Sequence, residues 1–116
     1  MVRLLDLKTK ASIVQLILSG SGERAVELLS KEFGVRPPKL VVGLPKGRSK
    51  SLGCYVARNE TIYVRDRRAL FDPYVILHEM YHHLRTHVRE HRGSERKAHQ
   101  FALDFLAALE TASIET

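Results

Sequence analysis

The feature that most constrains this chain is a pentapeptide at residues 78–82, with the sequence His-Glu-Met-Tyr-His. Its two histidines, His78 and His82, are four positions apart. One helical turn takes about 3.6 residues, so a helix places both imidazoles on one side, where they can bind one metal ion. Glu79 lies about 100° around the helix from His78 and can reach a water on that ion. The pattern therefore predicts a helix with two zinc ligands and a general base.

The residues around the pentapeptide predict a helix over about residues 73–88. Asp72 has the side chain of an N-cap, and Pro73 has the fixed φ of a first helical position. Apolar residues at helical spacing predict a face that packs on a sheet: Leu77, Met80, Tyr81, Leu84 and Val88. The two histidines lie about 100° from this face, where a ligand is partly desolvated but still reachable.

Two helices and a sheet are expected before the pentapeptide. Residues 9–33 carry helical periodicity in two pieces, with a break at the Ser-Gly repeat of residues 19–22 and a C-cap at Gly34. Within about residues 39–66, runs rich in β-branched residues predict short strands, the last two joined as a hairpin: 40–44, 52–56 and 61–65. The whole pattern predicts one α+β domain over residues 1–116, with a sheet of three or four strands.

A last helix is expected over about residues 95–110, followed by a C-terminal tail at 111–116. Ser94 has the side chain of an N-cap, and an apolar stripe follows it: Ala98, Ala102, Phe105 and Leu109, joined by Phe101. Continuing the stripe backwards places Glu95 on the same face. A carboxylate on a packed face is costly unless a cation meets it, so Glu95 is a candidate metal ligand.

Composition limits the class of protein. With 44% apolar and 28% charged residues, the chain is typical of a globular domain. Cys54 is the only cysteine, which excludes an intrachain disulfide and favours a reducing, cytoplasmic setting. We recognise no signal peptide and no apolar run long enough to cross a membrane. The net charge of +6 could favour nucleic acid, but we prefer solvated basic faces because no nucleic-acid motif is present.

A hydrolytic zinc centre uses three protein ligands and keeps its fourth position for water, so the pentapeptide needs one further ligand. Glu95 is our third ligand, because its helix is expected to meet the first one. His99 could replace it, but it fits better as support for the site or as a donor to the reacting carbonyl. Glu90 is a weaker alternative. Glu79 would be the general base, passing a proton from zinc-bound water to the leaving amine.

The histidines of this region also allow a less specific interpretation. All six histidines of the chain lie between residues 78 and 99, so a basic, histidine-rich segment could match the pentapeptide by chance. His83, His87 and His91 repeat the same four-residue spacing. They predict either a second metal-binding stripe or, as we favour, a solvated face.

The pentapeptide, followed by Glu95 on a helix with small and aromatic residues, resembles the gluzincin metallopeptidases. Over roughly residues 40–110 the chain is most similar to ImmA/IrrE-type enzymes and single-domain minigluzincins. The resemblance implies a zincin-like fold, Glu95 as the third zinc ligand, and an extended peptide substrate that pairs with one strand of the sheet. It also implies latency through the C-terminal tail, with Glu110 or Glu115 at the open zinc position.

The chain departs from its expected relatives at several positions. Many gluzincins have an acidic residue one turn after the metal-binding glutamate, where this chain has His99. The separate C-terminal subdomain that supplies a transition-state tyrosine or histidine has no counterpart here. The extended metzincin pattern is also absent, because Arg85 and Val88 stand where it needs a glycine and a histidine.

The leading functional hypothesis is a zinc-dependent endopeptidase that cleaves peptide or protein substrates bound in extended form. One alternative is a zinc-stabilised, non-catalytic module that binds protein or nucleic acid through its basic surface. Another is a DNA-linked protease of the SprT kind, with His99 as a ligand and a DNA-binding cluster at Arg85, Arg89 and Arg92. Glu79 separates the first two, because a structural site has no use for a carboxylate beside its ligands.

Overall fold

The computed structural model describes residues 5–47, 51–87 and 95–115, with side chains up to residue 113. Within these ranges the chain forms four α-helices, a mixed three-stranded sheet and two short 3-10 helices. The elements run in the order α1 (Leu7–Leu18), α2 (Gly22–Phe33), β1 (Lys39–Val42), β2 (Gly53–Val56), η1 (Ala57–Asn59), β3 (Thr61–Val64), η2 (Ala69–Phe71), α3 (Pro73–His87) and α4 (Glu95–Glu115). The predicted α+β class is therefore confirmed.

Capping residues set the start of the first N-terminal helix and the end of the second. The Asp6 carboxylate accepts a hydrogen bond from the Thr9 backbone N–H at 2.8 Å and caps α1. Gly34 ends α2 with φ at 70°, a left-handed conformation that glycine adopts without strain. The predicted pair of helices and the glycine cap are both confirmed.

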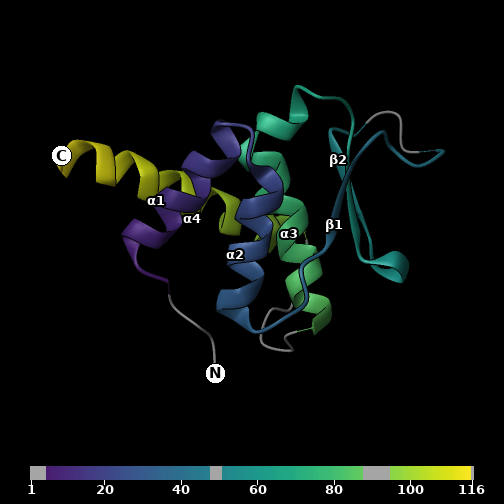
Figure 1. Cartoon of the computed structure of the whole chain (residues 1–116), viewed down its shortest axis with the longest axis horizontal. Helices are drawn as coiled ribbons and strands as arrows, with labels where there is room; N and C mark the ends of the chain where they lie inside the picture. The colour runs from purple at the N-terminus through teal and green to yellow at the C-terminus, as the bar shows by residue number, and fades with distance from the viewer. Residues whose placement is uncertain (1–4, 48–50, 88–94, 116) are drawn as a thin grey trace.

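The sheet has the strand order β1-β3-β2, with β1 parallel and β2 antiparallel to β3. The predicted hairpin is the β2–β3 pair, and η1 forms most of its connection. The helices lie on one side of the sheet (Figure 1), where α3 packs against β2 and β3. Buried side chains from all four helices and from β3 meet in the core: Ile17, Leu29, Ile62, Val64, Met80, Leu84 and Phe105.

Helix α3 begins as the sequence predicts. The Asp72 carboxylate accepts hydrogen bonds from the backbone N–H groups of Tyr74 at 2.9 Å and Val75 at 3.4 Å, and Pro73 takes the first helical position. The apolar face is buried as expected at Leu77, Met80, Tyr81 and Leu84. Val88 lies outside the described residues.

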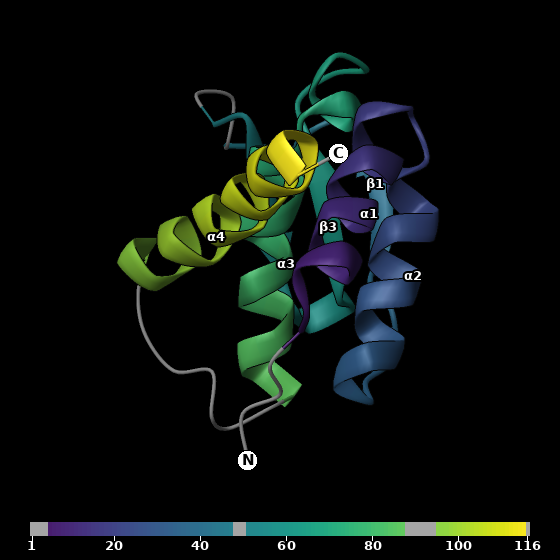
Figure 2. The ribbon, with the colours of Figure 1, turned by 90° about the vertical axis from the view of Figure 1, so that its left-hand side faces the viewer.

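Helix α4 is longer than the sequence suggested. It continues to Glu115, so the predicted separate tail is wrong for residues 111–115. It crosses α3 obliquely and runs beside α1 (Figure 2), where Lys10 forms an ion pair with Asp104. Its stripe of Ala98, Ala102 and Phe105 is buried, and the two alanines leave room for α3. None of the helices in the described ranges has the length and apolar character needed to span a membrane.

Candidate metal centre

Three side chains converge where the N-terminus of α4 meets the middle of α3. The Nε2 atoms of His78 and His82 lie 2.8 Å and 2.6 Å from the two carboxylate oxygens of Glu95. The two imidazole rings are 5.3 Å apart between centroids, as expected for positions i and i+4 of one helix. The structure thus brings together the three residues that the sequence proposed as ligands.

The exposure of Glu95 differs from the sequence-based expectation. We expected its carboxylate on a packed face, but the side chain is 76% exposed. The described part of α4 begins at this residue and packs against α3 from Ala98 onwards. The histidines are more buried than the carboxylate, at 12% and 18% exposure. Glu95 therefore closes the site from its solvent side.

The protonation preferences of His82 and Glu95 suit metal ligands. Burial lowers the pKa of His82, although the Glu95 carboxylate beside it acts in the opposite direction. Burial tends to raise the pKa of Glu95, but its hydrogen bond to His78 and the charges of both histidines lower it below the ordinary value. A neutral imidazole and an ionised carboxylate are the forms that bind a metal.

The donor set fits a catalytic zinc ion. One ligand atom from each of His78, His82 and Glu95 lies within 4.8 Å of the others. Two imidazoles and one carboxylate are a known ligand set for hydrolytic zinc, which keeps a further position open. One divalent cation can replace the hydrogen bonds between the two histidines and Glu95, because metal binding releases the protons that ligands carry.

One candidate ligand lacks the hydrogen bond that would normally fix its ring. The Nδ1 atom of His78 is buried and has no hydrogen-bond partner among the described residues. A ligating imidazole usually donates this second N–H to a carbonyl or carboxylate, which fixes the ring. Here the ring of Tyr74, 5.6 Å from that of His78 between centroids, packs beside it instead.

Glu79 lines the same cleft as two of the three candidate ligands. The cleft has a volume of about 380 Å³ and lies between β2 and α3. Its walls include Gly53, Tyr55, Glu79, His82, Arg85 and Glu95. A Cβ atom on Gly53 would lie only 2.7 Å from Val75 and 3.3 Å from Glu79, so glycine lets β2 approach the helix closely. The proposed general base therefore lies close to the edge strand, in the cleft that His82 and Glu95 also line.

His99 does not join the three ligands. Its Nδ1 atom lies 2.7 Å from the hydroxyl of Tyr74, and its ring makes an edge contact with the Tyr74 ring. Tyr74 in turn packs beside His78, so His99 reaches the site through this tyrosine. The weaker ligand candidate, Glu90, lies outside the described residues.

The predicted latency contact is not formed by Glu110. Glu95 and Glu110 belong to one continuous helix, in which fifteen positions at about 1.5 Å each span roughly 22 Å. A glutamate side chain extends only a few ångströms, so Glu110 cannot reach the cleft, and this prediction is wrong for the fold described here. The side chain of Glu115 lies outside the described part.

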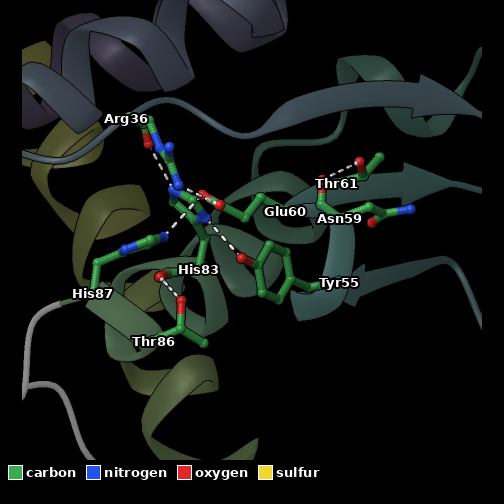
Figure 3. A network of polar contacts seen from close by, with 8 residues as sticks. All are labelled: Arg36, Tyr55, Asn59, Glu60, Thr61, His83, Thr86 and His87. Atoms are coloured by element: carbon green, nitrogen blue, oxygen red, sulfur yellow. Dashed lines mark hydrogen bonds and ion pairs between the residues drawn. The ribbon is translucent and has the colours of Figure 1, made fainter.

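A second cluster surrounds His83 and His87 of α3 (Figure 3). His83 is fully buried, so the solvated face that we predicted for this residue is wrong. Its Nδ1 atom lies 2.8 Å from the Tyr55 hydroxyl, and its Nε2 atom lies 2.7 Å from the backbone carbonyl of Arg36. His87 pairs with Glu60 at 2.9 Å, and Glu60 also binds the Arg36 guanidinium at 2.6 Å. The third member of the predicted stripe, His91, lies outside the described residues.

The hydrogen bonds of His83 identify its tautomer. A carbonyl oxygen only accepts, so Nε2 must carry the proton that is donated to Arg36. The Nδ1 atom then accepts the hydrogen bond of the Tyr55 hydroxyl, and burial keeps the pKa of the imidazole below its ordinary value. Glu60, His83 and His87 lie close enough to hold a metal, but both nitrogens of His83 are already used. We therefore interpret the hydrogen bonds of His83 to the Tyr55 hydroxyl and to the Arg36 carbonyl as a lock that joins α3, β2 and the segment after α2.

Replacing His83 should show how much this lock contributes to stability. We expect His83→Ala to lower the free energy of unfolding by about 2–4 kcal/mol, because it opens a cavity and leaves the Arg36 carbonyl without its donor. Urea unfolding of the metal-free protein measures the change. His87→Ala is the matched control and should cost much less, because its ion pair with Glu60 is partly exposed. Equal losses in the two variants would contradict the lock.

Sequence reasoning missed the lock and the role of Gly53, because both depend on contacts between distant parts of the chain. The glycine inside a predicted strand was the only available signal, since such a glycine often marks a close backbone approach. No protein-family model, curated protein or solved structure matches the chain. Its function is therefore inferred from the chemistry of the site.

Proposed function

We propose that this protein is a zinc-dependent endopeptidase. The observation that carries the proposal is the convergence of His78, His82 and Glu95 beside a cleft that Glu79 also lines. Zinc held by these three ligands would polarise the scissile carbonyl and acidify a water molecule. Three protein ligands with a neighbouring carboxylate are the arrangement of hydrolytic zinc rather than of structural zinc, which is normally closed by four.

The residues of the chain divide the remaining work. Glu79 would take a proton from the attacking water and deliver it to the leaving amine, as a general base and then a general acid. The limited exposure of His78 and His82 keeps water from competing for their nitrogens. The close approach of β2, which Gly53 allows, would hold the scissile bond near Glu79.

The edge of β2 offers a means of holding an extended substrate. Arg65 donates its backbone N–H to the carbonyl of Leu52 at 2.9 Å, so this pair is a hydrogen-bonded one. Such pairs alternate along an antiparallel ladder, which turns the backbone groups of Gly53 and Tyr55 away from β3. In the described sheet β2 pairs only with β3, so these groups can bind the backbone of a peptide by strand addition.

The alternatives receive less support from the site. A non-catalytic zinc module would be expected to close its metal with a fourth ligand, and the described residues around this centre supply three. An SprT-like protease would use His99 as a ligand, whereas His99 is hydrogen-bonded to Tyr74. Of its proposed DNA-binding cluster, Arg89 and Arg92 lie outside the described residues.

Metal removal tests the proposal directly. The purified protein should cleave an unfolded, casein-like substrate, and a chelator should abolish the cleavage because the three ligands would then bind no cation. Adding one equivalent of Zn²⁺ should restore activity, whereas Mg²⁺ should not, because it prefers an octahedral shell of oxygen ligands. Cleavage that is indifferent to the chelator would refute the proposal.

A further inference from the structure

Arg85 lines the cleft but has no role in the proposed mechanism. It lies on α3 three positions after His82, so the two side chains are neighbours on the helix surface. It lines the cleft together with Tyr55 and Thr86. Arg85 therefore borders the space that a substrate would fill.

The described surroundings leave this guanidinium available to a ligand. Within residues 5–47, 51–87 and 95–113, Arg85 forms no ion pair, whereas Arg36 and Arg65 each bind a carboxylate. The other charged side chains of the cleft are Glu79 and Glu95, which the proposed mechanism assigns to the proton transfer and to the metal. With zinc bound, this wall of the cleft would carry a net positive charge.

The relative direction of β2 and α3 indicates where a bound peptide meets Arg85. Gly53, at the start of β2, lies against Val75 and Glu79, whereas Tyr55 reaches His83 one turn later. The strand and the helix therefore run in the same direction. A peptide that pairs antiparallel to β2 would place its scissile bond beside Glu79 and the residues preceding that bond toward Arg85. Antiparallel pairing is the more stable kind per residue.

We propose that Arg85 selects substrates with an acidic side chain on the N-terminal side of the scissile bond. This inference rests on the proposed endopeptidase function. The guanidinium presents five N–H donors in a planar fork that matches a carboxylate, and a lysine or arginine at the same substrate position would be repelled. The positive net charge of the chain would attract acidic segments to the protein.

Paired peptides test the selection. Fluorogenic peptides that differ only by Glu or Lys at each of the three positions before the cleaved bond are compared by kcat/KM. The zinc-loaded wild type should prefer Glu at one of these positions by about five- to tenfold, the range expected for a partly exposed charge-assisted hydrogen bond. Arg85→Glu should reverse the preference. Arg24→Glu is the matched control: it makes the same charge change on α2, which does not line the cleft, and should keep the preference.

A binding measurement separates this inference from the proposed function. In a Glu79→Gln background, fluorescence anisotropy of the same peptides should show the same preference and the same reversal by Arg85→Glu. Equal binding and equal cleavage of Glu and Lys peptides would overturn the selection while leaving the endopeptidase intact. Absence of all cleavage by the zinc-loaded wild type would refute the proposed function, and the anisotropy data would still decide on Arg85. Arg85-dependent binding of an oligonucleotide, with both peptides bound alike, would assign the arginine to nucleic acid and overturn the proposal.

Discussion

Glu79→Gln should lower the turnover of a peptide substrate by roughly 10²- to 10⁴-fold, the range typical of a lost general acid–base group. The amide keeps the shape of the side chain but cannot take a proton from the attacking water. Because Glu79 is not one of the three converging ligands, the variant should still bind one equivalent of zinc. Cleavage kinetics and metal analysis of the same preparation measure the two effects.

The two measurements distinguish a loss of catalysis from a loss of metal. Glu27→Gln is a suitable control, because it makes the same chemical change on the exposed surface of α2, away from the cleft. It should leave both turnover and zinc content unchanged. Full activity in Glu79→Gln would refute the assigned role of the carboxylate, and loss of zinc would place Glu79 among the ligands.

Glu95→Ala should weaken zinc binding by at least about 100-fold, because it removes one of only three protein ligands. An outer partner of a zinc ligand typically contributes 10- to 100-fold, so His99→Ala should produce a smaller effect, of about tenfold or less. Both affinities are measured by competition with a chromophoric chelator. Without metal, each variant should have nearly the same free energy of unfolding as the wild type, because both side chains are exposed.

The comparison of these two variants also distinguishes the gluzincin-like site from its nearest rival. In an SprT-like site His99 would be the third ligand, and the order of the two affinities would be inverted. The described geometry favours the first order, since Glu95 lies within 2.8 Å of both imidazoles and His99 is held by Tyr74. A weaker affinity in His99→Ala than in Glu95→Ala would contradict our assignment.

The parts of the structure that could be predicted are those fixed by local chemistry. The N-cap at Asp72 and the left-handed Gly34 each act within one helical turn, so the sequence located the start of α3 and the end of α2. The proximity of His78 and His82 is likewise a property of the helix. Glu95 could be proposed because it opens a helix whose apolar stripe was expected to meet α3.

The parts that could not be predicted depend on distant contacts or on missing stop signals. The lock joins His83 to Arg36, which is 47 positions away, and no periodicity reveals such a pair. The end of α4 was misplaced because no glycine or proline follows Glu110, and the helix continues through residues that tolerate it. The exposure of Glu95 was misjudged because a helical stripe does not show where packing begins.

The lock and the metal centre are built from consecutive residues of α3, His82 and His83, which point to different sides of the helix. The rotation of α3 about its own axis is therefore set by two assemblies at once. Side-chain atoms lie roughly 5–6 Å from that axis, so a turn of about 10° moves them by about 1 Å. A displacement of this size can cost a reaction about 10²-fold. A change at Tyr55, which is not a candidate metal ligand, would thus act on the proposed reaction by turning the helix.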